Sequence, residues 1–123
     1  MIKISFCIPT YNFGKFIGET LQSIVDQASD EIEIEIVIGD GASTDNTRDI
    51  VRKFQDKFSF IHYYKFNNKG GIDKDLARTV ELSNGEYCWL LSADDVLMPG
   101  SINAMLKYIS SSNSIYLVNR VEC

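Results

Sequence analysis

The sequence is poor in the residue types that mark several common protein classes. It has three cysteines and one histidine among 123 residues, and its 12 lysines and arginines are outnumbered by 17 acidic residues. A formal net charge of -5 without a basic cluster argues against a nucleic-acid-binding surface. The purely apolar stretches are short, whereas a bilayer span needs roughly 20 such residues. Neither a membrane-spanning helix nor a signal peptide is therefore expected.

The few cysteines and the single histidine limit the chemistry further. An odd number of cysteines without CxxC spacing indicates neither a disulfide framework nor a zinc site, and favours a reducing, cytoplasmic compartment. Cys7 and Cys88 lie in apolar runs, where a thiol behaves as a small hydrophobic group. His62 lies in an apolar strand, so we expect it to pack there rather than to serve as a base for a catalytic thiol.

The remaining composition, 45% hydrophobic and 24% charged, is typical of one globular domain. Apolar runs alternate along the chain with apolar residues at helical spacing. Strands are expected at residues 2–8, 32–39, 60–64, 87–91 and 114–118. Helices are expected at about 13–28, from 43 or 45 to 54, between 71 and 84, and at 102–109. This order predicts an α/β fold with a mostly parallel sheet and helices on both faces.

Ligands bind to such sheets at the carboxyl ends of the strands. Polar residues follow three of the predicted strands at this edge. They are Pro9-Thr10-Tyr11-Asn12, the segment 39–45, and Ser92-Ala93-Asp94-Asp95.

Asp94 and Asp95 form an adjacent pair of carboxylates shortly after a wholly apolar strand. Such neighbours repel each other, which raises the free-energy cost of ionising both unless a cation or hydrogen-bond donors offset it. Mg²⁺ or Mn²⁺, held by one or two carboxylates and substrate phosphates, would do so. An acidic turn before the next helix explains the spacing equally well, so the pattern alone leaves both interpretations open.

Two glycine-rich segments precede predicted helices. Asp40 stands between two glycines, so the backbone can approach a ligand and the carboxylate can accept a hydrogen bond from a base or a ribose. An ordinary strand-to-helix turn, capped by Ser43 or Asp45, is the alternative. The stretch 68–73 could bring backbone N–H groups and Lys69 near a diphosphate, although a solvated loop is the simpler interpretation.

The segments 5–12 (SFCIPTYN), 37–45 (VIGDGASTD) and 85–95 (GEYCWLLSADD) together resemble the nucleotide-binding region of family 2 glycosyltransferases with the Rossmann-like GT-A fold. The stretch 71–75 (GIDKD) is similar to the branch of abequosyltransferase-like O-antigen enzymes. The likeness covers nearly the whole chain. It implies that residues 1–123 form one donor-binding domain, truncated after the acid-pair region and lacking the acceptor half.

The resemblance also implies roles for individual residues. The implied nucleotide-binding residues are Pro9, Thr10, Asn12, Asp40, Gly41, Asp73 and Asp94. Among these, Thr10 would line the base pocket and Asp40 would bond the base. Asp95 would be the principal ligand of a Mn²⁺ or Mg²⁺ ion, and Asp94 would contact the ribose or the metal shell. Ser92 departs from the pattern, because many relatives have a further Asp there.

By this resemblance, the protein transfers a sugar from a nucleoside diphosphate to a saccharide or lipid-linked acceptor in surface polysaccharide synthesis, with inversion. The metal stabilises charge on the leaving diphosphate, and an acid on the acceptor half acts as general base. Glu122 is the only acidic residue after Asp95. We therefore expect the general base to lie outside this chain, which alone would bind the donor without transferring sugar.

Two other functional classes remain as alternatives. A non-catalytic module that binds nucleotide sugars fits the apparent lack of a base. A phospho-acceptor receiver domain has a similar length, but it needs an acid pair after the first strand, where this chain has Pro9-Thr10-Tyr11.

The expected partners are a nucleotide-sugar donor and its acceptor, and no nucleic acid. The whole protein is expected in the cytoplasm, with peripheral docking at the inner face of the membrane. An uncovered sheet edge beside the fifth strand would favour self-association.

Overall fold

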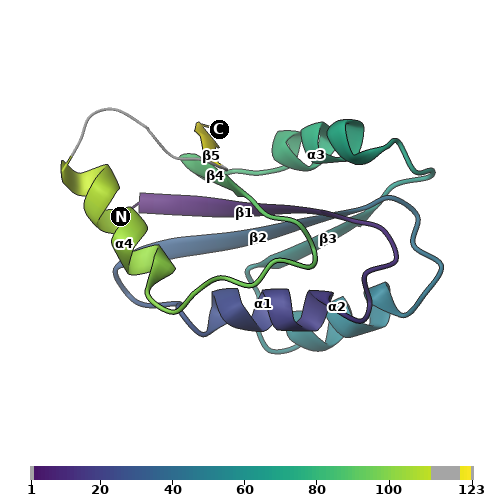
Figure 1. Ribbon diagram of the computed structural model, residues 1–123, viewed down its shortest axis with the longest axis horizontal. Coiled ribbons are helices and arrows are strands. Elements are labelled where there is room, and N and C mark those ends of the chain that lie inside the picture. The colour runs from purple at the N-terminus through teal and green to yellow at the C-terminus, as the bar shows by residue number, and fades with distance from the viewer. Residues whose placement is uncertain (1, 112–119, 123) are drawn as a thin grey trace.

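The computed structural model describes residues 2–111 and 120–122, along which strands and helices alternate as predicted (Figure 1). The strands are β1 (Ile2–Thr10), β2 (Ile32–Asp40), β3 (Ile61–Lys65), β4 (Tyr87–Leu90) and β5 (Arg120–Glu122). The helices are α1 (Ile17–Val25), α2 (Thr47–Gln55), α3 (Ile72–Glu81) and α4 (Ser101–Ser111). No helix in the described part of the chain has both the length and the apolar character that crossing a membrane requires.

The described strands form one sheet in the order β3-β2-β1-β4-β5. The first four are parallel, which confirms the predicted mostly parallel sheet, and β5 runs antiparallel to β4. β1 pairs with β2 over its whole length, so that Thr10 lies opposite Asp40 at the carboxyl edge. The strand predicted at residues 114–118 lies outside the described residues.

Helices cover both faces of the sheet, as predicted. α1 and α2 lie along one face, and α3 lies along the other (Figure 1). The main core joins the sheet to α1 and α2 and is rich in isoleucine. Its fully buried side chains include Ile4, Phe6, Ile8, Ile17, Leu21, Ile24, Ile36, Ile38 and Val51. Burying one such side chain contributes about 1.5–3 kcal/mol, so this layer is a principal source of the stability of the fold.

α3 packs against the backbone of β2 on the opposite face. A Cβ atom at Gly39 would overlap Thr79 Oγ1, so a larger residue at this position would displace the helix. The buried Thr79 hydroxyl donates a hydrogen bond of 2.7 Å to the Asp75 carbonyl within the same helix. The Thr79 hydroxyl therefore has a hydrogen-bond partner within the protein, although its packing against the sheet shields it from water.

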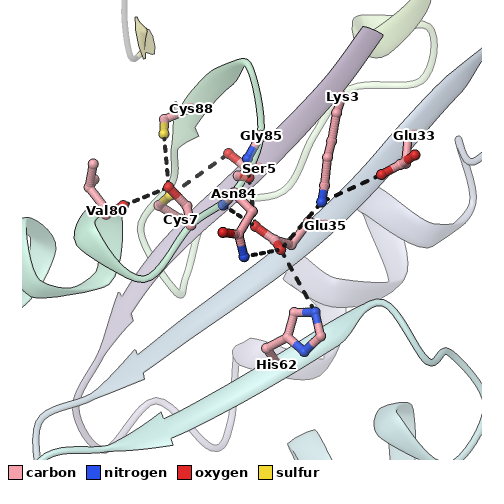
Figure 2. A network of polar contacts seen from close by, with 11 residues as sticks. Lys3, Ser5, Cys7, Glu33, Glu35, His62, Val80, Asn84, Gly85 and Cys88 are labelled. Carbon is pink, nitrogen blue, oxygen red and sulfur yellow. Dashed lines mark hydrogen bonds and ion pairs between the residues drawn. The ribbon is translucent and has the colours of Figure 1, made fainter. Parts of the chain in front are cut away.

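A buried polar network ties the turn before β4 to the sheet (Figure 2). Glu35, only 4% exposed, accepts hydrogen bonds from Ser5 Oγ at 2.7 Å and from the Asn84 N–H at 2.9 Å. The same Ser5 oxygen accepts the Gly85 N–H at 2.8 Å. Glu33, two residues before Glu35, is exposed. The network therefore fixes where β4 starts relative to β1 and β2.

Charged neighbours complete this network. Lys3 Nζ and His62 Nε2 each lie 3.8 Å from Glu35 Oε2. Burial by itself would raise the pKa of Glu35, but hydrogen bonds from Asn84 and Ser5, aided by Lys3, lower the pKa below its usual value. The His62 side chain is 44% exposed beside this carboxylate, so it is only partly packed and not enclosed in an apolar strand as expected.

The two described cysteines differ. Cys7 is a buried free thiol, and burial raises its pKa to about 11, in agreement with the expected hydrophobic role. Cys88 is disulfide-bonded, so the expectation that the cysteines stay unpaired was wrong at this position.

Candidate functional site

The loops that follow β1 and β2 are joined to each other at the carboxyl edge. Asn12, in a left-handed backbone conformation with φ 55°, donates its N–H to Ser43 Oγ at 2.9 Å. Its own Oδ1 accepts the Thr44 N–H at 2.7 Å. Asp45 accepts the Gly14 N–H at 3.0 Å. The predicted nucleotide-binding residue Asn12 thus connects two loops and is not among the residues that line the cavity described below.

Asp45 lies just before α2, whose N-cap residue is Asn46 and makes no side-chain capping bond, so the prediction that Ser43 or Asp45 is the N-cap was wrong. Asp45 Oδ1 nevertheless accepts the Thr47 N–H at 3.0 Å. Burial by itself would raise the pKa of Asp45, but the hydrogen bonds from Thr47 and Gly14 lower it below its usual range. The carboxylate is therefore charged and well placed to stabilise the helix N-terminus.

Asp40 is fully buried at the end of β2. Its Oδ1 accepts the Ser43 N–H at 2.8 Å, and its Oδ2 accepts the Tyr63 hydroxyl. Burial and the nearby carboxylate raise the pKa of Tyr63 well above its usual value, so this hydroxyl stays protonated and donates. Both oxygens of Asp40 therefore have protein partners, as the turn interpretation of this segment requires.

A cavity of about 510 Å³ lies at the carboxyl end of β1. It is lined by Pro9, Thr10, Tyr11, Phe13, Lys69, Gly71 and Asp75. The buried Thr10 Oγ1 has no hydrogen-bond partner, a condition that costs about 1–3 kcal/mol unless a ligand relieves it. The Lys69 ammonium lies 4.2 Å from the Tyr11 ring centroid. An apolar wall with a few polar groups is typical of small-molecule sites.

Sequence reasoning missed one aspartate in this cavity. Asp73, which was expected to bind nucleotide, is exposed and does not line the cavity, whereas Asp75 does and is only 3% exposed. Asp75 Oδ1 accepts the Gly70 N–H at 3.1 Å and pairs with Arg78. Helical spacing could have revealed it, because Asp75 lies one turn before Thr79, on the side of α3 that faces the sheet.

Three of the predicted nucleotide-binding residues gather at this cavity. Pro9 and Thr10 line it directly. Gly41 lies against its wall, since a Cβ atom at Gly41 would be only 2.5 Å from Asp75 Oδ2. A glycine at this position therefore lets α3 bring its buried carboxylate close to the loop that follows β2.

Asp94 and Asp95 are exposed in the loop after β4. The Ser92 hydroxyl donates to Asp94 Oδ1 at 2.6 Å, and the Ser92 N–H donates to Asp95 Oδ2 at 3.1 Å. No group of three or more metal-ligating side chains occurs among the residues that the structure describes. Two carboxylates with substrate phosphates nevertheless suffice for Mg²⁺ or Mn²⁺. Within the described part of the chain, each carboxylate uses one oxygen in these bonds and has no hydrogen bond on the other. The acid pair therefore fits such an ion.

One side of α1 holds the loop that carries this acid pair. Thr20, Ser23 and Gln27 form hydrogen bonds to backbone groups between residues 93 and 102. These bonds include the Ala93 carbonyl at 2.9 Å, the Leu97 N–H at 3.0 Å and the Met98 carbonyl at 2.9 Å. The position of the carboxylates thus depends on a helix that contributes no ligand itself.

Comparison with known proteins agrees with this geometry. Residues 5–123 match the sequence profile described as glycosyl transferase family 2. The chain belongs to this family. Among its family 2 relatives, abequosyltransferase RfbV of Salmonella typhimurium is 39% identical over 120 residues, which are 97% of this chain and 36% of RfbV. The poly(ribitol-phosphate) β-N-acetylglucosaminyltransferase TarS of Staphylococcus aureus is 30% identical over 122 residues, 99% of this chain and 21% of TarS.

Solved structures show that this family 2 chain has the GT-A fold. S. aureus TarS 1-349 in complex with UDP superposes with a TM-score of 0.82 and 28% identity, over 89% of this chain and 32% of that one. The mannosyltransferase PcManGT of Pyrobaculum calidifontis, in complex with GDP-Man and Mn²⁺, superposes with a TM-score of 0.77 over 87% and 32%; at 24% identity it supports the fold alone. The chain thus spans about a third of these structures and of RfbV, and about a fifth of TarS.

Proposed function

We propose that this chain is the donor-binding domain of a glycosyltransferase that builds a surface polysaccharide from nucleoside-diphosphate sugars. The observation that carries the proposal is the cavity at the carboxyl end of β1, which Pro9, Thr10 and Asp75 line. The loop with Asp94 and Asp95 follows β4, the strand next to β1. A pocket for a nucleoside beside a carboxylate pair for a diphosphate is the arrangement that this chemistry requires.

Similar proteins support this choice of ligand. TarS was solved with UDP and with UDP-GlcNAc, and PcManGT with GDP-Man and Mn²⁺. Within our proposal, Pro9, Thr10 and Gly41 surround the nucleoside, while Asn12 and Asp40 support the surrounding loops. Asp73 is exposed at the start of α3, where it is open to the diphosphate.

We assign the metal-holding role to Asp95 and Asp94. Bound Mn²⁺ or Mg²⁺ would supply Lewis-acid stabilisation of the leaving diphosphate. The hydroxyl and amide of Ser92 orient the two carboxylates through one oxygen of each. Thr20 fixes the backbone one residue before Asp94. The second oxygens remain available as ligands.

The general base for an inverting transfer is proposed to come from outside this chain. Glu122 is the only acidic residue after Asp95. It pairs with Tyr87, the first residue of β4, whereas the acid pair follows the last residue of that strand. A base at Glu122 would therefore lie at the opposite edge of the sheet from the donor.

The setting of the reaction is also part of the proposal. The acceptor would be a saccharide or a lipid-linked saccharide, used on the cytoplasmic side with peripheral contact to the membrane. Self-association through the sheet edge beside β5, the last strand in the order, also belongs to the proposal. Sedimentation over a range of chain concentrations tests that association.

The main test is a thermal-shift and titration series with UDP, CDP, GDP and dTDP, with and without Mn²⁺. One nucleotide should raise the Tm in a metal-dependent way, since a ligand that binds only the folded state stabilises it. A transfer assay with that donor and a panel of acceptors should show no turnover. A positioned base contributes about 10²–10⁴-fold to the rate, so turnover equal to that of a longer protein from the same reading frame would contradict the donor-domain proposal.

A further inference from the structure

We infer that the acceptor saccharide lies in a second cavity, between the end of α1 and the start of α4, so that this chain binds part of the acceptor as well as the donor. The inference rests on the proposed function, because it places the second substrate of that reaction, and it leaves the general base outside the chain. This α1–α4 cavity has a volume of about 580 Å³, within the range of roughly 300–1,000 Å³ of small-molecule sites. It shares no lining residue with the cavity at the carboxyl end of β1.

The α1–α4 cavity starts beside the acid pair. Val96, the residue directly after Asp95, lines it. Ser29, three residues before β2 begins at Ile32, also lines it, which places another part of the lining near the amino edge of the sheet. The segment from β4 to α4 runs along α1 between these two places (Figure 1). A ligand of several linked units would therefore reach from the acid pair along α1, which suits an acceptor chain whose terminal unit receives the sugar.

The lining divides into an apolar part and an exposed polar part. The apolar residues include Val96, Leu97 and Pro99, and the polar residues with exposed side chains are Asp26, Ser29 and Asn103. A sugar ring divides in the same way, since C–H groups cover its faces and hydroxyls surround its edge. A carboxylate accepts hydrogen bonds from such hydroxyls, whereas an amide both donates and accepts. The lining thus matches the surface of a saccharide.

The charge of the lining argues against other ligand classes. Among the described residues that line the α1–α4 cavity, Asp26 is the only charged one, and none has an aromatic ring. A nucleotide or a free phosphate would meet a carboxylate without a cation to offset the repulsion, and a base would have no ring to stack on. The cavity at the carboxyl end of β1 differs, because Lys69 and Tyr11 line it. The α1–α4 cavity therefore suits a neutral ligand that is rich in hydroxyls.

The walls of this cavity are fixed by bonds within the protein. Ser23 and Gln27 use their polar atoms to hold the backbone of residues 97–102, through hydrogen bonds of 2.9 to 3.0 Å. In the described part of the chain, the Asp26 side chain has a hydrogen bond on Oδ1 only, and the Asn103 amide has none. A preformed wall lowers the entropy cost of binding. The exposed carboxylate and amide are therefore open to a ligand that lies against this wall.

The test titrates the chain with four neutral trisaccharides, maltotriose, mannotriose, galactotriose and chitotriose, and follows its backbone amide signals by two-dimensional NMR. At least one trisaccharide should cause saturable shifts at residues 26–29 and 96–103. Asp26→Ala should weaken this binding about tenfold, the scale of a hydrogen bond to a charged group, and Asn103→Ala about threefold. Ala28→Phe should abolish it, because Ala28 lines the cavity and the ring would fill it.

Two matched controls accompany these variants. Asp49→Ala on α2 and Lys107→Ala on α4 remove exposed charged side chains outside the lining of the α1–α4 cavity. Both should bind the trisaccharide like the parent chain. Thermal unfolding checks the fold of each variant.

A second readout tests whether the saccharide reaches the acid pair. Mn²⁺ broadens the NMR signals of nearby protons, so an ion held by Asp94 and Asp95 should broaden the proton signals of the bound trisaccharide. Asp95→Asn, compared at saturating trisaccharide, should remove most of this broadening. Equal broadening with Asp95→Asn and with the parent chain would show that the saccharide lies away from the reaction and would overturn its assignment as acceptor.

The outcomes separate the inference from the proposed function. Mn²⁺-dependent binding of UDP, CDP, GDP and dTDP, measured on the same variants, should match the parent, since the two cavities share no lining residue. Saturable shifts with none of the trisaccharides, or equal trisaccharide binding by Ala28→Phe and the parent, would overturn the inference and leave the donor-binding proposal intact. If the parent chain binds none of the four nucleotides, the proposed function and the inference fall together.

Discussion

The Ser5 hydroxyl and the Glu35 carboxylate face each other across β1 and β2 at 2.7 Å, inside the sheet. The Ser5 hydroxyl oxygen also accepts a hydrogen bond from the Gly85 N–H, and the Glu35 carboxylate accepts one from the Asn84 N–H. Two neighbouring strands and the turn before β4 therefore meet at one buried charge. Because β4 has only four residues, the place of this turn determines where the acid-pair loop begins.

Glu35→Gln should destabilise the chain in a pH-dependent way. The pKa of Glu35 lies below its ordinary 4.5 in the folded chain, so its contribution is complete above about pH 4.5 and is lost as the pH falls through the folded pKa. At pH 7 the variant should lose about 1–3 kcal/mol, and the difference should shrink in acid. Urea unfolding at several pH values measures this.

Glu33→Gln is the matched control, because Glu33 is exposed and pairs only with Lys3 at 3.5 Å among the described contacts. An exposed pair contributes about 0.2–1 kcal/mol. A Glu35→Gln deficit that persists unchanged at pH 3 would show that the charge of this carboxylate is not what stabilises the turn.

Asp95→Asn should remove the metal dependence of nucleotide binding and leave the fold intact. Asp95 is exposed and its structural bond is one contact with the Ser92 N–H, which an amide oxygen can replace. Titration with the preferred nucleotide, with and without Mn²⁺, measures the effect. Asp30→Asn, an exposed acid before β2, serves as control. An unaltered response of Asp95→Asn to Mn²⁺ would refute the metal assignment.

Thr20→Val should weaken metal-dependent binding more than metal-free binding. The change keeps the shape of a fully buried side chain but removes the donor to the Ala93 carbonyl, which costs about 1–3 kcal/mol. Thr20→Ser keeps the donor and should restore most of the loss. Equal weakening with and without Mn²⁺ would indicate a general loss of stability instead of a displaced acid loop.

Ala42→Gly should stabilise the chain. Ala42 has a backbone φ of 71°, a left-handed conformation that costs a residue with a Cβ about 1–2 kcal/mol relative to glycine, offset in part by the greater freedom of unfolded glycine. The Tm should therefore rise by a few degrees in calorimetry. Gly100→Ala is the converse control, because Gly100 has φ 84° and open space around it. It should lower the Tm.

The strands of the sheet could be predicted because the spacing of apolar residues within each segment, and the order of the segments along the chain, can be read from local sequence. The run 32–38 changes from alternating to continuously apolar, as a strand entering a two-sided core does. Helix boundaries were less predictable, since Phe13 and Phe16 continue the apolar spacing but form a turn before α1 begins at Ile17. Apolar spacing reports which face packs, and it does not mark where backbone hydrogen bonding begins.

The candidate site was predictable where it consists of strand ends and unpredictable where it depends on packing between elements. Pro9 and Thr10 end a central strand, so topology alone brings them to the ligand edge. Asp40 was expected to meet a ligand, but Tyr63 from β3 closes over it. Asp75, for which no role was predicted, lies on α3 and lines the cavity. Those burials depend on residues more than 20 positions away, which no local pattern reports.

The close packing of α3 against Gly39 limits which substitutions this site can accept. Any side chain at position 39 would push α3 away from the sheet and move Asp75 with it. The α3 side of the cavity, where Asp75 lies, therefore depends on a glycine at position 39. Tyr11, Phe13 and Lys69 lie on loops and tolerate exchange more readily. Substitutions around the cavity should therefore be tolerated on its loop side more readily than at position 39.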